Sequence, residues 1–210
     1  MILLTGFESF GGESSNPSWP AVQQAAAALT ASGLPATAVE LPVVFGDAAD
    51  ALRNALADGG IELVLSVGQA GGRAAMSLER VAINIDDARI PDNAGRQPVD
   101  EPVVPGGPAA FFSTLPVKAC LQALTDARIP AEVSQTAGTF VCNHVFYALM
   151  HELARQPGVR GGFIHVPNSP EQAVDGPSME VAEMARGLEI VARTALAVTA
   201  DIKLGAGATH

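Results

Sequence analysis

Short apolar segments alternate with helix-length amphipathic segments along the chain, and this alternation constrains the fold more than any other feature. Residues 61–67 form a nearly continuous apolar run that ends at Gly68, which is typical of a strand buried on both faces. Further strands are expected at 2–5, 37–41, 81–85, 132–135 and 162–166, and helices at 17–30, 47–56, 116–127, 141–155 and 178–200. The sequence therefore predicts an α/β fold: one domain over residues 1–210, with three layers formed by helices on both faces of an open, twisted, mainly parallel sheet.

Composition limits the number of cores and the class of partner. A chain of 210 residues that is 48% hydrophobic can fill one substantial core. It carries 22 acidic and 12 basic residues, for a formal net charge of −10, which argues against nucleic acid and against an anionic membrane surface as partners. We interpret the acidic balance as a contribution to solubility.

The first residues and the two cysteines indicate the compartment. Residues 1–6 are apolar but short and have no basic leader, so they predict a buried first strand instead of a signal peptide. The sequence has no run of roughly 18 apolar residues that would span a bilayer. Cys120 and Cys142 form no CxxC pair, in agreement with a reducing compartment. We therefore expect a cytoplasmic protein, with Cys120 buried in an amphipathic helix.

The carboxyl ends of the strands are the expected place for a functional site, because loops and helix amino termini meet there in open parallel sheets. This rule predicts one cleft shared by residues 5–7, 67–69, 136–142 and 165–167. Residues 91–108 are rich in Pro, Gly and Asp and are too long for an ordinary connection, which indicates a functional or oligomer-contact loop.

Cys142 is the candidate nucleophile because a polar turn gives way to a helix-period apolar run at this residue. The first N–H groups of a helix lack internal partners and favour a thiolate over a thiol. The alternative is a small buried apolar side chain, the usual environment of a free cysteine.

A cysteine nucleophile needs a base, and helix geometry leaves one of the four histidines. His144 and His151 are rotated by about 200° and about 180° from Cys142 on the same expected helix, so we interpret them as surface or capping residues. His210 lies in a Gly/Ala-rich tail. His165 ends the strand that follows this helix and can reach the cleft, although a satisfied core histidine is an equal alternative.

The base needs a partner that fixes its tautomer, and Glu79 is one of several candidates. Glu79 stands just before the strand-like run at 81–85. A charged residue at a strand entrance is more often solvated, here with Arg80 as a neighbour, so the pattern alone is only suggestive.

Several stretches together resemble one known family. Residues 68–84, with Gly68, Gly71 and Leu78-Glu79-Arg80, and residues 138–143, with Cys142, resemble the type I pyroglutamyl peptidases, also called pyrrolidone-carboxylate peptidases. Residues 5–12, 16–19, 87–93 and 162–167 fit as well, so the resemblance covers nearly the whole chain in order. It implies an open α/β sandwich, frequently assembled as homotetramers.

The resemblance also implies an activity and a site. The family removes an N-terminal pyroglutamyl residue from peptides, using a triad that carries over to Glu79, Cys142 and His165. Peptides with N-terminal pyroglutamate and further copies of this chain, as a tetramer or dimer, are then the expected partners. No metal or organic cofactor is expected, and the sequence has no Cys/His cluster that suggests one.

The implied substrate pocket is mostly apolar because the pyroglutamyl lactam is neutral, flat and compact. By resemblance, Phe7, Phe10 and Phe140 flank the ring, while Gln69 and backbone groups around Val141 bind the lactam edge. Core packing is the alternative for each phenylalanine.

Two positions depart from the family pattern. Ser9 stands where proline is usual, and Asn168-Ser169 replaces a more apolar pair. We expect the first to loosen the pocket loop and the second to alter a subunit or substrate contact.

Two other functions are alternatives to this one. The glycine-rich turn after residue 67 suggests a phosphate cradle and a nucleoside phosphorylase-like enzyme, but Gly68, Gly71 and Gly72 make neither GxGxxG nor a P-loop. The other alternative is a non-catalytic oligomer-forming protein with an inert buried thiol.

Overall fold

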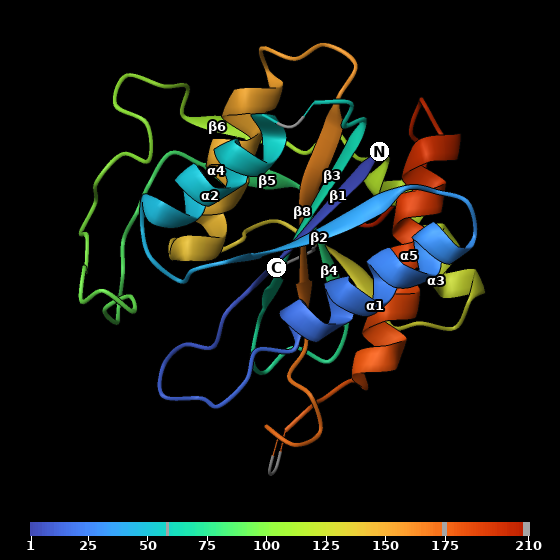
Figure 1. Cartoon of the computed structure of the whole chain (residues 1–210), viewed down its shortest axis with the longest axis horizontal. Coiled ribbons are helices and arrows are strands. Elements are labelled where there is room, and N and C mark those ends of the chain that lie inside the picture. The colour runs from blue at the N-terminus through green and yellow to red at the C-terminus, as the bar shows by residue number, and fades with distance from the viewer. Residues whose placement is uncertain (58, 174–175, 208–210) are drawn as a thin grey trace.

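A six-stranded sheet in the order β2-β1-β3-β8-β4-β7 separates two groups of helices (Figure 1). The computed structural model describes residues 1–57, 59–173 and 176–207. The strands are β1 (Ile2–Phe7), β2 (Ala36–Leu41), β3 (Leu63–Gln69), β4 (Met76–Glu79), β5 (Val81–Ile83), β6 (Ala110–Phe112), β7 (Ala131–Ser134) and β8 (Arg160–Val166). The helices are α1 (Ser18–Ala31), α2 (Asp47–Ala57), α3 (Val117–Asp126), α4 (Val141–Leu153) and α5 (Val181–Ala197).

The sheet is mainly parallel, as the sequence predicts. Strands β2, β1, β3 and β8 run in one direction, and β4 pairs antiparallel with β8 while β7 pairs parallel with β4. The carboxyl ends of β1, β3 and β8 therefore meet at one edge, which Phe7, Gln69 and Val166 mark as the last residues of these strands.

Each face of the sheet has its own apolar core, because the strand side chains alternate between the two helix layers. Helices α1, α3 and α5 pack on one face and α2 and α4 on the other (Figure 1). Strand β3 supplies Leu63, Leu65 and Val67 to the first core and Val64 to the second. This double coverage explains the continuous apolar run at 61–67.

The region between residues 76 and 112 differs from the expected pattern. The predicted strand at 81–85 is shorter, β5, and it pairs with β6 in a separate two-stranded sheet instead of joining the main sheet. The main sheet takes β4 in its place, a strand that the pattern did not predict because it is only four residues long and ends in the charged Glu79.

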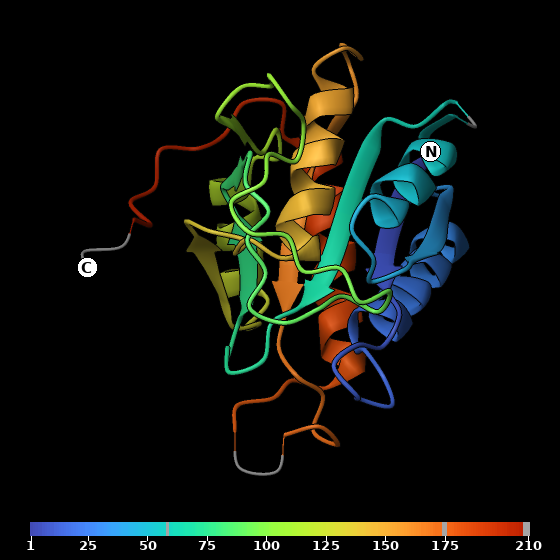
Figure 2. The ribbon, with the colours of Figure 1, turned by 90° about the vertical axis from the view of Figure 1, so that its left-hand side faces the viewer.

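The long segment from 84 to 109 runs over the side of the molecule that carries α2 and α4 (Figure 2). Side chains of α4 hold both of its ends. The Asn143 amide donates to the carbonyls of Ile83 and Ile85, and the Tyr147 hydroxyl donates to the Pro108 carbonyl at 2.6 Å. The segment is therefore attached to the same helix that begins at the candidate nucleophile.

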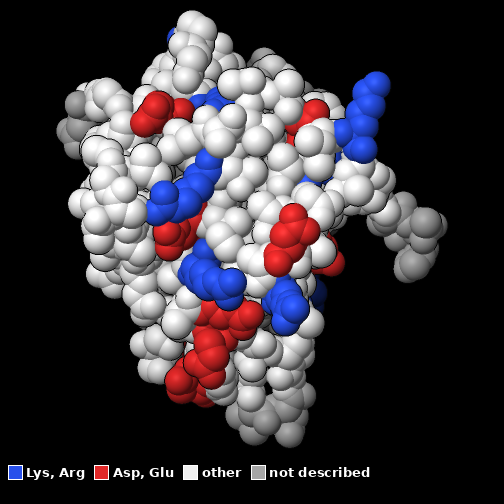
Figure 3. Space-filling model, turned by 90° about the vertical axis from the view of Figure 1, so that its right-hand side faces the viewer, with Lys and Arg blue, Asp and Glu red and all other residues white. Residues whose placement is uncertain are grey.

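The surface agrees with the mixed charge of the sequence. On the face that Figure 3 draws, basic and acidic side chains are interspersed. None of the helices in the described residues has the length and apolar character needed to cross a membrane.

Candidate active site

Cys142 is the second residue of α4 and lies at the edge of the sheet. The chain enters the helix through Gly138, at φ +78°, and Phe140, which is extended. No side chain caps this end, so the first N–H groups of α4 remain available to other acceptors. The helix starts close to β3, because a Cβ added to Gly68 would lie only 2.7 Å from Cys142 Sγ. A side chain at position 68 would therefore displace the thiol from the place it occupies over β3.

His165 lies beside the thiol because of the strand register. Gly68 of β3 pairs with His165 of β8 in parallel register, and paired residues direct their side chains to the same face of a sheet. The imidazole is 4% exposed and packs on Phe163, with ring centroids 4.9 Å apart. The described hydrogen bonds include none between Cys142 Sγ and the imidazole; the two groups are neighbours above the same strand pair.

Glu79 holds the imidazole from the other side. Strand β4 pairs antiparallel with β8, with Ser77 opposite His165, and Glu79 lies two residues further on the same face. His165 Nδ1 donates to Glu79 Oε1 at 2.7 Å, which leaves Nε2 on the opposite side of the ring. Glu79 is fully buried, so the alternative of a solvated residue paired with Arg80 does not hold.

Arg73 is the second donor to this carboxylate. Its guanidinium donates to Glu79 Oε1 at 2.8 Å and to the Thr136 carbonyl, on the segment that leads into α4, at 3.4 Å. Glu79 Oε2 is buried and has no hydrogen-bond partner among the described residues. A buried carboxylate needs opposite charge and donors nearby, and Arg73 supplies a charge that no pattern in the sequence indicates.

Burial and local charge favour the protonated form of the Cys142 thiol over the thiolate. Burial raises the pKa of Cys142 to about 12, the Glu79 carboxylate acts in the same direction, and the Arg73 charge acts against both. The helix amino terminus was expected to favour the thiolate; desolvation and a nearby negative charge outweigh it. A base is therefore needed to take the proton during reaction.

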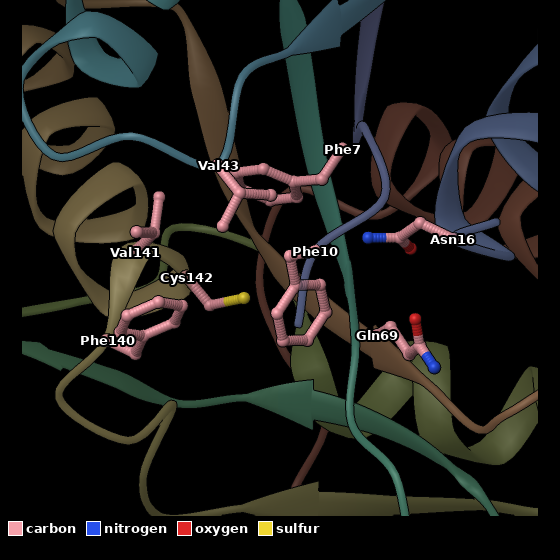
Figure 4. A pocket seen from close by; sticks show the side chains of 8 residues that line it. All are labelled: Phe7, Phe10, Asn16, Val43, Gln69, Phe140, Val141 and Cys142. Atoms are coloured by element: carbon pink, nitrogen blue, oxygen red, sulfur yellow. The ribbon is translucent and has the colours of Figure 1, made fainter. Parts of the chain in front are cut away.

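A pocket opens beside the sulfur, which points into it in Figure 4. All five residues proposed to bind substrate line it together with the thiol: Phe7, Phe10, Gln69, Phe140 and Val141. The Phe10 and Phe140 ring centroids are 6.3 Å apart. Phe7 is 2% exposed and also belongs to the core, so packing and pocket lining coincide there.

Gln69 supplies an uncommitted acceptor to the pocket wall. Its Nε2 donates to Asn168 Oδ1 at 2.8 Å and to Gln172 Oε1 at 3.3 Å. Its Oε1 is buried without a partner among the described residues. A buried acceptor left unpaired costs free energy, which a ligand donor in the pocket would recover.

Asn16 and Val43 also line the pocket and were not anticipated as pocket residues. Asn16 Oδ1 accepts from the N–H and hydroxyl of Ser18 at the start of α1, a common role for Asn before a helix. That local role gives no hint of the pocket, which forms only when the loop after β1 folds over the sheet.

The remaining histidines do not reach the thiol. His144 is predicted to be a surface or capping residue but is buried, with Nδ1 2.8 Å from Asp86 Oδ2 and Nε2 accepting from the Gly46 N–H. Helix α4 is covered by the sheet and also by α2 and the segment after β5, so facing away from the thiol does not mean facing water. His151 is partly exposed in the last turn of α4 and interacts with Arg155, and His210 lies outside the described residues.

Fold and site together define a class. A thiol that lines an apolar pocket, an imidazole on the neighbouring strand pair and a buried carboxylate bound to that imidazole lie on one face of an α/β sandwich. These are the side chains of a cysteine hydrolase. Residues 1–57, 59–173 and 176–207 contain no group of three or more His, Cys, Asp or Glu side chains placed to hold a metal ion.

Comparison with known proteins gives the particular family. A family model described as pyroglutamyl peptidase matches residues 1–201. The pyrrolidone-carboxylate peptidase of Klebsiella pneumoniae is 58% identical over 212 residues, which cover 100% of this chain and 99% of that protein. The protein of the same name from Streptomyces coelicolor is 57% identical over 214 residues, with the same coverage. The chain belongs to the pyroglutamyl peptidase family.

Solved structures agree. The crystal structure of pyroglutamyl peptidase I from Bacillus amyloliquefaciens has a TM-score of 0.92 and 46% identity, covering 96% of this chain and 98% of its own. A variant of the pyrrolidone carboxyl peptidase from Pyrococcus furiosus has a TM-score of 0.86 and 40% identity, covering 93% and 98%.

The contact between Arg73 and Glu79 predicts a charge-dependent effect on stability. We expect Arg73→Met to lower the free energy of unfolding by about 2 kcal/mol, because it leaves a buried carboxylate without its cation. In a Glu79→Gln background the same change is expected to cost less than about 0.5 kcal/mol. Urea unfolding measures both free-energy changes. As a control, Arg53→Met removes a cation from an exposed ion pair and should lower the free energy of unfolding by about 0.5 kcal/mol or less. Equal costs of Arg73→Met in both backgrounds would contradict the pairing.

The raised pKa of the Cys142 thiol predicts how its alkylation depends on pH. A raised pKa keeps the proton on sulfur at pH values where an ordinary thiol, with a pKa of about 8.5, would lose it. In a Cys120→Ala background, the rate of reaction with iodoacetamide is expected to keep rising with pH beyond about 9, whereas the urea-unfolded protein levels off there. A rate that is already constant between about pH 5 and pH 8 would instead reveal a preformed thiolate.

Proposed function

We propose that the protein is a cysteine peptidase that removes an N-terminal pyroglutamyl (5-oxoprolyl) residue from peptides through a thioester acyl-enzyme. The observation that carries this proposal is the position of Cys142 Sγ, which lies in an apolar pocket above the strand pair that carries His165. Family membership supports the same substrate, and the named relatives are peptidases of this kind.

In the acylation step, Cys142 Sγ attacks the carbonyl carbon of the pyroglutamyl residue while its proton passes to His165 Nε2. The carbonyl oxygen becomes an oxyanion, and the unpaired N–H groups of the first turn of α4 are its stabilising donors, since loss of one such donor typically costs about 10²-fold or more in rate. As the tetrahedral centre collapses, the C–N bond breaks and Nε2–H protonates the leaving amine.

In the deacylation step, His165 Nε2 takes a proton from water, and the hydroxyl attacks the thioester carbon. The C–S bond breaks, pyroglutamate leaves, and the proton returns to sulfur. Glu79 holds the proton on Nδ1 throughout and balances the positive charge that forms on the ring in each step. The positive charge of Arg73 balances the negative charge of Glu79 while the His165 ring is neutral.

Recognition follows from the neutral lactam. The substrate lacks the charged ammonium group of other peptide N-termini, and the pocket offers it aromatic rings from Phe7, Phe10 and Phe140. We assign the lactam N–H to Gln69 Oε1, the buried acceptor without a partner, and the ring carbonyl to backbone donors near Val141. A free amino group would be desolvated here without an anionic partner.

The alternatives have less support. The family match and the named relatives give no support to a nucleoside phosphorylase-like enzyme. An inert thiol fits Cys120, which is fully buried, better than Cys142, which lines the pocket.

We also propose a single domain over residues 1–210 that acts in the cytoplasm as a homo-oligomer, a tetramer or dimer. The two free cysteines support a reducing compartment. Exposed large apolar side chains between residues 85 and 112 support a contact between copies: Ile85, Ile90, Val99 and Phe112.

The decisive experiment is hydrolysis of a pyroglutamyl chromogenic amide by the wild-type protein and by Cys142→Ser. We expect the wild type to cleave it and to be inactivated by iodoacetamide, and Cys142→Ser to lose at least about 10³-fold in kcat/KM because a serine hydroxyl is a much poorer nucleophile here. Cys120→Ala removes the buried thiol and should stay active. A nucleoside with phosphate tests the phosphorylase alternative in the same preparation.

Equal turnover by wild type and Cys142→Ser would contradict the nucleophile assignment. Absence of amide cleavage by a folded wild-type protein, or phosphorolysis in its place, would contradict the proposed function.

A further inference from the structure

The segment from 168 to 172 determines how the Gln69 side chain meets the pocket. Gln69 Nε2 has two hydrogens, and the segment accepts both, at Asn168 Oδ1 and at Gln172 Oε1. The amide nitrogen therefore turns away from Cys142 Sγ, as Figure 4 shows. An amide whose donors are both occupied can offer the pocket only its acceptor, Oε1.

The backbone fixes this orientation, so it does not depend on the Gln69 side chain alone. Gln172 Nε2 donates to the Ser15 carbonyl at 3.0 Å, and Gln172 Oε1 accepts from the Ser169 N–H at 3.3 Å. Gln172 must then present an acceptor to Gln69. The backbone groups of residues 15 and 169 thus orient the Gln172 amide, and the Gln172 amide orients that of Gln69.

Asn168 accepts the shorter of the two hydrogen bonds that Gln69 Nε2 donates, at 2.8 Å against 3.3 Å for Gln172. Its amide lies against Gly71, where an added Cβ would be 3.2 Å from Oδ1, and its backbone carbonyl accepts from the Met179 N–H. Asn168 is one of the positions where this chain departs from the more apolar family pattern. An apolar residue there could not accept from Gln69.

We propose that Asn168 is a positioning residue that makes the pocket selective for a ring N–H. By holding Gln69 Nε2, it keeps Gln69 Oε1 directed to the lactam N–H and prevents the flipped amide, which would present N–H to N–H. This inference rests on the proposed function and adds a source of its specificity. Asn168 itself touches neither the thiol nor the ring in this account.

The test compares two substrates that differ in one group. One is a pyroglutamyl amide, and the other is the matched 3-oxocyclopentane-1-carbonyl amide, in which CH₂ replaces the ring N–H. We expect the wild type to prefer the lactam by about 10²-fold or more in kcat/KM, because the analogue leaves Gln69 Oε1 unpaired. Asn168→Leu is expected to lose about tenfold on the lactam, mainly through KM, with little change on the analogue.

The control is Asn168→Asp, which keeps an oxygen acceptor at the same place. It should restore most of the preference for the lactam, which a merely structural role would not explain. Urea unfolding midpoints show whether the variants are folded. If Asn168→Leu does not fold, Gln172→Leu removes the second acceptor and is expected to reduce the preference in the same way.

The outcomes separate the two proposals. If the folded wild type cleaves neither substrate, the proposed function falls and this inference with it. If the wild type prefers the lactam and Asn168→Leu keeps the same ratio, or loses activity equally on both substrates, the inference is overturned while the proposed function stands.

Discussion

The hydrogen bond between His165 and Glu79 is the interaction on which the rest of the site depends. It joins two strands that run in opposite directions, and it requires a carboxylate to be fully buried at the end of β4. A charge in that position is costly unless donors surround it, and the imidazole N–H and the Arg73 guanidinium supply them. The arrangement fixes which ring nitrogen carries the proton, and it leaves the other nitrogen free to act on the thiol. The same hydrogen bonds to Glu79 therefore stabilise this part of the sheet and orient the catalytic imidazole.

The layers of the fold bring the nucleophile to this pair. The Cys142 thiol lies over β3 at Gly68, where a Cβ would be 2.7 Å from the sulfur, and the strand register puts His165 on the same face beside Gly68. The same helix anchors the segment after β5 through Asn143 and Tyr147. One helix thus carries the candidate nucleophile, Cys142, and the side chains that hold the segment after β5. The pocket is formed from the loop after β1, the end of β3 and the start of α4, three segments far apart in the chain.

Much of this was predictable from sequence, and the reasons for the exceptions are physical. Alternating apolar strands and long helices predicted the α/β sandwich. The rule of carboxyl ends predicted one cleft shared by residues 5–7, 67–69, 136–142 and 165–167; the first three segments line the pocket, whereas residues 165–167 do not. Residue patterns gave only weak support to Glu79, whose burial depends on His165, 86 residues away, and on Arg73 in the turn before β4. His144 was misassigned for the same reason, since its partner Asp86 lies 58 residues away. The raised pKa of the Cys142 thiol comes from burial and a neighbouring carboxylate, which a local helix-end argument does not contain. Family resemblance supplied the triad because it carries tertiary information.

The tautomer of His165 is the most direct test of this account. Nitrogen-15 NMR of the ligand-free protein with labelled histidine distinguishes a protonated ring nitrogen from an unprotonated one, and the His165→Gln variant assigns the signals. At neutral pH the account predicts a proton on Nδ1, held by Glu79, and none on Nε2, with the Nδ1 proton signal lost or moved in Glu79→Gln. A proton on Nε2 with Nδ1 bare would contradict it, because that ring could not take the proton of Cys142.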